Sequence, residues 1–136
     1  MDCGVPFCHW ACPLGNKPPE WNDALYKGDY ELAYRLLNDT NDFPEFTGRI
    51  CPALCEKACV LNLMEHEPTT NREDEAAITE MAFQENFVRI ATPERNGKKV
   101  AVIGAGPAGL VAANQLNLKG YTVTVYDKNE AAGGLL

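Results

Sequence analysis

The sequence lacks long apolar runs and clusters of positive charge. No stretch of its 136 residues reaches the roughly 18 consecutive apolar residues that a membrane helix needs, and no basic segment leads into an apolar run at the N-terminus, as in a signal peptide. The 12 Lys and Arg residues are scattered among 19 Asp and Glu residues, and the net charge is −7. Because nucleic-acid phosphates attract clustered basic side chains, we expect neither a nucleic-acid partner nor a membrane partner.

The sequence does contain enough apolar surface to fold, together with two groups of cysteines. Hydrophobic residues make up 46% of the chain and charged residues 23%, which is typical of a soluble globular chain with one modest core or two small ones. The six cysteines fall into two groups, Cys3, Cys8 and Cys12, then Cys51, Cys55 and Cys59. We expect the protein in the cytoplasm, where thiols stay reduced and grouped cysteines more often bind metal than form disulfides.

The spacing within these groups favours iron–sulfur clusters. Three residues separate Cys8 from Cys12, and Pro13 follows Cys12 directly, as at the end of bacterial ferredoxin cysteine runs. Cys51 is likewise followed directly by Pro52. Zinc usually takes cysteines in paired sets with roughly two to four intervening residues. The i, i+4 spacing of the second group predicts that its three sulfurs lie along one face of a helical turn. The alternatives to an iron–sulfur cluster are a zinc site and buried structural cysteines or disulfides.

Short helical patterns precede and follow the second cysteine group. One covers residues 20–26, and another covers residues 30–38 with Asp29 as its N-cap. A longer helix is predicted over residues 72–87, with an apolar stripe formed by Ala77, Ile78, Met81 and Ala82. Both tryptophans are expected in the core or as shields of a metal site.

The domain organisation follows from a change of pattern near residue 92. Residues 1–91 are predicted to be a helical cluster-binding domain, and the polar, breaker-rich residues 92–98 a linker. Residues 99–136 are predicted to begin a second domain with a strand, a helix and a strand, over residues 99–103, 107–119 and 121–126. The fold class is therefore mixed, with an all-α domain followed by the first βαβ unit of an α/β Rossmann-type domain.

A glycine turn joins the first predicted strand to its helix, and it has the pattern Gly104-Ala105-Gly106-Pro107-Ala108-Gly109. The first glycine allows the tight turn, the second allows a pyrophosphate to approach, and the third allows helix and strand to pack closely. Asp127 ends the second strand, where an acid accepts hydrogen bonds from a ribose. The turn predicts a dinucleotide site; a purely structural turn, with Asp127 as a solvated acid, is the alternative.

Two segments resemble one known family. Residues 3–16 (CGVPFCHWACPLGN) and 43–59 (FPEFTGRICPALCEKAC) are similar to the small (beta) subunits of NADPH-dependent glutamate synthase, and the similarity covers essentially the whole chain. The wider family includes the N-terminal part of dihydropyrimidine dehydrogenase, and it carries two 4Fe-4S clusters followed by FAD and NADPH domains. The resemblance implies that the glycine turn binds FAD, and that the chain passes the flavin at Gly133, Gly134 and Leu135.

The resemblance also implies how the ligands are shared. One cluster takes Cys3, Cys8 and Cys59, and the other takes Cys12, Cys51 and Cys55. A Glu or Gln from the following helix completes the second cluster in the relatives, and counting from Pro68 places this ligand at Glu75. Because Asn71 and Asp74 are polar where many relatives have aliphatic residues, Glu73 is the alternative ligand. A solvated acid at the start of a helix is the non-ligand alternative for Glu75.

The resemblance implies an electron-input subunit. NADPH would reduce FAD, and single electrons would pass through the clusters to a large (alpha) subunit that makes glutamate from glutamine and 2-oxoglutarate. Two rivals are a related ferredoxin-NADP reductase or pyrimidine-reducing flavoprotein, and a non-enzymatic zinc-binding module. The family has a further cysteine three positions before Cys3, and a dinucleotide domain needs a third strand. We therefore expect a fragment that is inactive alone, and we predict no catalytic side chain on it.

Overall fold

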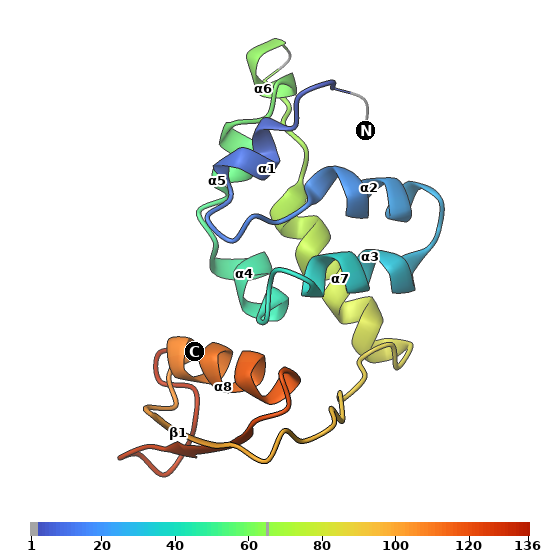
Figure 1. The fold of residues 1–136 in the computed structure, drawn as a ribbon. Coiled ribbons are helices and arrows are strands. Elements are labelled where there is room, and N and C mark those ends of the chain that lie inside the picture. The colour runs from blue at the N-terminus through green and yellow to red at the C-terminus, as the bar shows by residue number, and fades with distance from the viewer. Residues whose placement is uncertain (1–2, 65) are drawn as a thin grey trace. The chain divides into compact units, whose positions relative to one another are not determined.

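The computed structural model describes residues 3–64 and 66–136, which form two compact units (Figure 1). The first unit ends at Val88 and the second begins at Arg89. The regular elements of the first unit, within the described residues, are the helices α1 (Phe7–Ala11), α2 (Pro18–Tyr26), α3 (Tyr30–Asn38), α4 (Pro44–Ile50), α5 (Leu54–Lys57), α6 (Leu61–Met64) and α7 (Asn71–Gln84). The second unit contains β1 (Lys99–Ile103), α8 (Pro107–Leu118) and β2 (Thr122–Tyr126). Among the described helices, none is both long and apolar enough to cross a membrane.

Helices α2 and α3 begin where the sequence supplies start signals. Pro18 is the first residue of α2, a position where the missing N–H of proline costs no hydrogen bond. The Asp29 side chain accepts a hydrogen bond from the Leu32 backbone N–H at 3.0 Å and thereby caps α3. The predicted span 30–38 and its N-cap are confirmed, whereas α2 begins two residues before the predicted start at residue 20.

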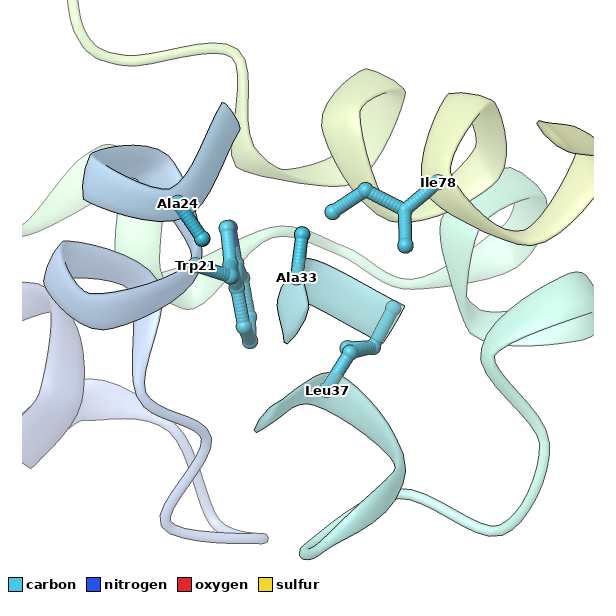
Figure 2. Close-up of a cluster of buried hydrophobic side chains, with 5 residues drawn as sticks. All are labelled: Trp21, Ala24, Ala33, Leu37 and Ile78. Carbon is cyan, nitrogen blue, oxygen red and sulfur yellow. The ribbon is translucent and has the colours of Figure 1, made fainter. Parts of the chain in front are cut away.

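The core of the first unit lies where α2, α3 and α7 meet (Figure 2). It is formed by five buried side chains, Trp21, Ala24, Ala33, Leu37 and Ile78. Trp21 is fully buried, so its predicted place in the core is confirmed. Trp10 is 80% exposed, and the prediction that it is buried or shields a metal site is wrong. Helix α1 is only five residues long and has no buried residue, so its outer side faces solvent.

The buried face of α7 is largely polar, unlike the predicted apolar stripe. Its buried residues are Asn71, Glu75, Ile78, Thr79 and Ala82. The predicted stripe is correct at Ile78 and Ala82 and wrong at Ala77, which is exposed. The helix ends at Gln84 rather than at residue 87, because Asn86 has a left-handed backbone with φ 58°. Polar groups at a helical spacing of four therefore face the interior of this unit.

Helices α4 and α7 approach each other closely at Gly48. A Cβ atom added to Gly48 would lie 2.7 Å from the backbone nitrogen and 2.9 Å from the Cα of Ala76. Such distances are too short for carbon contacts, so this crossing requires glycine. The preceding residue, Thr47, is thereby brought into hydrogen-bond range of Glu75 on α7.

The second cysteine group does not form the helical turn that its spacing predicts. Cys51 follows the end of α4 with an extended backbone (φ −62°, ψ 138°), and Ala53 is left-handed (φ 50°, ψ 54°). Only Cys55 lies within α5. The prediction of three sulfurs on one helical face is therefore wrong. Its physical cause is Pro52, which disfavours a helical backbone at the preceding residue.

The second unit is a parallel βαβ arrangement, as predicted. Strand β1 pairs with β2 in parallel, with Lys99 opposite Thr122 and Ile103 opposite Tyr126. Half-buried residues alternate with exposed ones along both strands. Both strands have contacts with α8, so α8 covers one face of this small sheet.

Part of the predicted linker is hydrogen-bonded to the second unit. The backbone N–H of Asn96 donates to the Gly120 carbonyl at 2.9 Å, and its side chain donates to the Lys119 carbonyl at 3.2 Å. The Arg95 guanidinium donates to the Tyr121 carbonyl at 2.7 Å. These bonds satisfy carbonyl groups at the C-terminal end of α8 and just beyond it.

Candidate functional site

Three of the six cysteines line a first cavity of about 240 Å³ in the helical unit. They are Cys3, which precedes α1, Cys8 within α1, and Cys59, which follows α5. The rest of the wall includes apolar side chains such as Val5 and Phe7. The structure thus brings together thiols from both sequence groups, in the set that the resemblance implies for one cluster.

The thiols of the first cavity differ in how readily they ionise. Burial raises the pKa of the Cys8 thiol, and a hydrogen bond from the His9 backbone offsets part of this rise. Burial also acts to raise the pKa of Cys59, but hydrogen bonds from the backbone of residues 61, 62 and 69 and from the Thr69 hydroxyl outweigh burial and lower it. Metal ligation requires the thiolate, so the surroundings of Cys59 favour ligation before any metal binds.

A second cavity of about 180 Å³ holds the remaining predicted ligands. Its lining includes the three other cysteines and one carboxylate, Cys12, Cys51, Cys55 and Glu75. Glu73 is exposed and does not line either cavity, so the position in the wall belongs to Glu75. Three soft thiols and one carboxylate therefore line the same small cavity.

Glu75 is held in place by a hydrogen-bond network that includes side chains from three other segments. Its Oε1 accepts a hydrogen bond from Asn16 Nδ2 at 3.2 Å, and its Oε2 accepts one from the Thr47 hydroxyl at 2.9 Å. Asn16 in turn accepts from the Thr40 hydroxyl at 2.7 Å, and Asn41 donates to the Thr47 oxygen at 2.7 Å. Every member of this buried network has a partner, so the carboxylate has one defined orientation.

Burial governs the ionisation of Glu75 and Cys55. It raises the pKa of the Glu75 carboxyl, and the hydrogen bonds from Thr47 and Asn16 offset part of the rise. It raises the pKa of the Cys55 thiol to about 11, with a partial offset from the neighbouring Asn71 side chain. A bound metal deprotonates a coordinating thiol, so loading this cavity would release protons.

The chemistry of the cavity walls suits iron–sulfur clusters. Among the residues that the structure describes, no three His, Cys, Asp or Glu side chains lie close enough to hold a single metal ion. The cysteines instead line two separate cavities, as the ligands of multi-atom iron–sulfur clusters do. Thiolates are the ligands that such clusters prefer.

The glycine turn of the second unit has the geometry of a dinucleotide loop. A Cβ atom on Gly109 would lie 1.9 Å from the Gly104 carbonyl oxygen, so glycine is required there for α8 to pack against the turn. A Cβ atom on Gly106 would meet no atom within 4 Å. Gly106 thus leaves open space in front of the turn. Pro107 and Ala108 start α8 behind it, with Pro107 at the first helical position.

Asp127 and the second glycine pair lie against this loop. Asp127 Oδ2 accepts a hydrogen bond from the Ala105 backbone N–H at 2.6 Å, and this bond, with one from Asn129, lowers the pKa of the carboxyl. The Gly133 N–H donates to the Ala105 carbonyl at 2.7 Å, and Gly134 lies against Gly106. Leu135 is fully exposed. The structure therefore brings Asp127, Gly133 and Gly134 to the predicted glycine turn.

Polar side chains near the thiols were not predicted from the sequence. These are Asn16, Asn41, Thr47 and Asn71, all of which line a cavity. Gly48 was missed as well, although it sets the distance between α4 and α7. A signal was available, because Asn16 and Thr47-Gly48 lie within the two segments that carry the family resemblance. Asn71 lies outside both segments.

Two protein families match the chain. Residues 1–87 match the family described as dihydropyrimidine dehydrogenase domain II, 4Fe-4S cluster, and residues 102–136 match the NAD(P)-binding Rossmann-like domain. The first match favours iron–sulfur clusters over zinc in the cavities. The second agrees with the parallel βαβ arrangement and its glycine turn.

Curated relatives are similar over the whole chain. Identity is 51% to the glutamate synthase (NADPH) small chain of Mycobacterium tuberculosis, of which the chain covers 28%. It is 48% to the glutamate synthase (NADH) of Saccharomyces cerevisiae, of which the chain covers 6%, and 41% to the putative oxidoreductase AegA of Escherichia coli, of which it covers 21%. The predicted resemblance to glutamate synthase small subunits is confirmed, and the chain spans less than a third of these relatives. Since the cluster family matches residues 1–87 of 136, the chain belongs to the 4Fe-4S family of dihydropyrimidine dehydrogenase domain II.

Proposed function

We propose that this chain is the cluster-binding part, and the start of the FAD-binding part, of the electron-input subunit of a glutamate synthase. In this proposal the whole protein takes electrons from NADPH and delivers them to a large (alpha) subunit, which makes glutamate from glutamine and 2-oxoglutarate. Bound FAD supplies a hydride acceptor that can release electrons singly, and bound 4Fe-4S clusters supply one-electron carriers. The protein supplies the ligands, the spacing and the insulation from water.

One observation carries the proposal. The cysteines line two separate cavities in the same two sets that the family resemblance implies, and Glu75 accompanies one set. The family resemblance predicted these sets, whereas the cavities come from the packing of the helices. The relatives named glutamate synthase support the wider assignment.

Each residue set has a distinct task in this proposal. Cys3, Cys8 and Cys59 bind one cluster through thiolate sulfur, and Cys12, Cys51, Cys55 and Glu75 bind the other. The hydrogen bonds from Asn16 and Thr47 orient the Glu75 carboxylate toward its cavity before any ligand binds. In the second unit, Gly104, Gly106 and Gly109 admit the pyrophosphate of FAD, and Asp127 accepts hydrogen bonds from its ribose.

The test is the iron, acid-labile sulfide and zinc content of the chain purified without oxygen. We expect equal amounts of iron and sulfide, about four of each per chain for each complete cluster, with broad visible absorption. Zinc without sulfide would overturn the proposal and support a zinc-binding module. Replacing Cys12 by Ser is a matched check, because the iron of the second cavity should then be lost.

A different electron acceptor is the second candidate. The 41% identity to the putative oxidoreductase AegA favours it, because that relative carries an oxidoreductase name without glutamate synthase. The two candidates differ in the partner of the whole protein. We expect the intact subunit to form glutamate from glutamine, 2-oxoglutarate and NADPH when it is mixed with a glutamate synthase large chain. Reduction of ferredoxin or of a pyrimidine without glutamate formation would favour the second candidate.

We also propose that the protein works in the cytoplasm. All six cysteines are free thiols in the structure, which suits a reducing compartment in which thiolates remain available to iron. Fractionation of cells with an antibody against the chain tests this placement, and recovery in an oxidising compartment would contradict it.

A further inference from the structure

Each oxygen of the Glu75 carboxylate has its own hydrogen-bond donor, and both donors are neutral. Asn16 Nδ2 donates to Oε1 at 3.2 Å, and the Thr47 hydroxyl donates to Oε2 at 2.9 Å. Both donors line the second cavity together with Glu75. Neutral donors orient a carboxylate without adding a positive charge that would compete with a metal for it. The carboxylate is therefore oriented and remains available as a ligand.

The Thr47 hydroxyl has a single proton and two acceptors within reach. Its oxygen lies 2.9 Å from Glu75 Oε2 and 3.3 Å from the Phe43 carbonyl oxygen. The bond to Phe43 is the one that a threonine in a helix can make to the residue four positions before it. Rotation of the hydroxyl toward Phe43 would take this donor away from Oε2. The direction of one O–H bond thus decides whether Glu75 is held at both oxygens.

Asn41, in the loop between α3 and α4, restricts that direction. The backbone N–H of Phe43 can only donate, and it donates to Asn41 Oδ1 at 3.0 Å, so the other end of this amide is its NH₂ group. The NH₂ group donates to the Thr47 oxygen at 2.7 Å. Asn41 is 2% exposed, so water does not replace it there. Because Asn41 presents a donor, the Thr47 proton is left for Phe43 or Glu75, and the shorter distance and the charge of an ionised carboxylate favour Glu75.

We propose that Asn41 and Thr47 are positioning residues that retain the iron atom bound by Glu75 in the second cavity. Asn41 directs the Thr47 hydroxyl to Oε2, and Thr47 keeps the carboxylate oriented toward the iron. The inference rests on the proposed function, because it requires a cluster there with Glu75 as a ligand. The other three ligands are thiolates, which bind cluster iron better than a carboxylate does. The iron at Glu75 is therefore the one whose retention depends most on the orientation of its ligand.

The test is the rate at which an oxidant removes this iron. When ferricyanide is added to the loaded chain without oxygen, one electron passes from the cluster to ferricyanide, the bond between Glu75 and iron breaks, and Fe²⁺ leaves. A 3Fe-4S cluster remains, with one positive charge less than the starting 4Fe-4S cluster. Electron paramagnetic resonance follows the 3Fe-4S cluster, and a ferrous chelator measures the released iron. Thr47 and Asn41 line the second cavity only, so any signal from the first cavity serves as an internal reference.

Two substitutions of Thr47 separate its hydroxyl from its methyl group. Thr47→Val removes the hydroxyl and keeps the shape, so we expect the second-cavity cluster to lose its iron about tenfold faster than in the wild type. Thr47→Ser keeps the hydroxyl and removes the methyl group, and it should lose iron at the wild-type rate. A role in packing alone would give the reverse order, because serine leaves a void and valine does not.

Asn41→Ser and Thr79→Val complete the set. Asn41→Ser keeps an oxygen that can accept from the Phe43 N–H and loses the amide donor to Thr47, so we expect a rate between those of the wild type and T47V. Thr79→Val is the matched control. Thr79 is buried on α7 and lines neither cavity, and its hydroxyl donates to the Glu75 backbone carbonyl at 2.8 Å. We expect T79V to lose iron at the wild-type rate.

The outcomes separate the inference from the function on which it rests. Wild-type chain without iron and sulfide would overturn both. Equal rates of iron loss in the wild type and T47V, or rates in T47S or T79V as high as in T47V, would overturn the inference alone. If T47V does not fold, N41S decides the matter in the same assay, and a wild-type rate in N41S would then count against the inference.

Discussion

The helical unit and the βαβ unit hold their candidate sites in opposite ways. In the helical unit the candidate ligands line cavities between helices, and the partners of Glu75 come from distant parts of the chain, since Asn16 and Thr47 are 59 and 28 positions from it. In the βαβ unit the candidate site is a loop on a two-stranded sheet, and Asp127 is exposed beside it. Tertiary packing therefore builds the first site, whereas local backbone geometry builds the second. The two sites should fail in different ways when residues are changed.

Cysteine substitutions within the helical unit give the largest expected effect. We expect Cys8→Ser to remove the iron and sulfide of the first cavity only, and Cys51→Ser those of the second only, because serine oxygen is a poor ligand for iron–sulfur clusters. With both cavities filled, each variant should keep roughly half of the wild-type iron. Iron analysis and electron paramagnetic resonance measure this. Loss of all iron from either variant would contradict two independent cavities.

The two tryptophans test how far the helical unit depends on its packed core. Trp21 is fully buried and Trp10 is 80% exposed. We expect Trp21→Ala to lower the free energy of unfolding by about 3–5 kcal/mol, because it leaves a large cavity. Trp10→Ala, the matched control, should change it by less than about 0.5 kcal/mol. Urea unfolding followed by circular dichroism measures both, and equal effects would contradict the assigned core.

Two glycines of the turn separate folding from ligand binding in the βαβ unit. Gly109→Ala places a Cβ atom against the Gly104 carbonyl oxygen, so we expect a loss of about 1–3 kcal/mol in stability. Gly106→Ala meets no protein atom within 4 Å, so the fold should persist. The methyl group would instead occupy the space needed by a pyrophosphate, and FAD affinity should fall by about tenfold or more. Unchanged FAD affinity in Gly106→Ala, measured by flavin fluorescence, would argue for a purely structural turn.

The pH dependence of stability gives the smallest effect and opposite signs in the two units. The folded-state pKa of Glu75 is raised above 4.5 by burial, with added repulsion from Glu56 and Asp74. The contribution of Glu75 to the stability of the metal-free chain is therefore full below about pH 4.5 and is lost as pH rises through the raised value. We expect Glu75→Gln to make the metal-free helical unit more stable at neutral pH and to flatten this dependence, as measured by urea unfolding at several pH values.

Asp127 supplies the contrasting case. Hydrogen bonds from the Ala105 and Asn129 backbone hold the pKa of its carboxyl below 3.8. The contribution of Asp127 is therefore present above about pH 3.8 and is lost as pH falls through the lowered value. Asp127→Asn should remove this acid sensitivity from the βαβ unit. A wild-type chain in which both units lose stability in the same pH direction would contradict the two assignments.

Much of the fold could be predicted from the sequence because its signals are local. The Asp29 cap, the strand–turn–helix pattern and the glycine spacing each act within a few residues, and the structure has α3, β1, α8 and β2 at or within two residues of the predicted bounds. The helical turn expected for the second cysteine group is absent, because Pro52 disfavours a helical backbone at Cys51. The i, i+4 spacing alone does not report this effect.

The surroundings of the candidate ligands could not be predicted in the same way. The partners of Glu75 depend on how α4 crosses α7 at Gly48, and no local pattern reports that crossing. Periodicity placed Ala77 on the buried face, because it counts apolar residues and gives no weight to a buried carboxylate with good partners. The ligand sets themselves came from the family resemblance, since spacing alone left zinc and structural cysteines open.

The hydrogen bonds around Ala105 have a consequence for the strength of dinucleotide binding. The Ala105 N–H is bound by Asp127, its carbonyl by Gly133, and the adjacent Gly104 N–H by the Tyr126 carbonyl. Ordering a free backbone costs about 1–2 kcal/mol of conformational entropy per residue. Since this loop is ordered by its own contacts, an arriving nucleotide meets a preorganised surface, and more of its interaction energy appears as affinity.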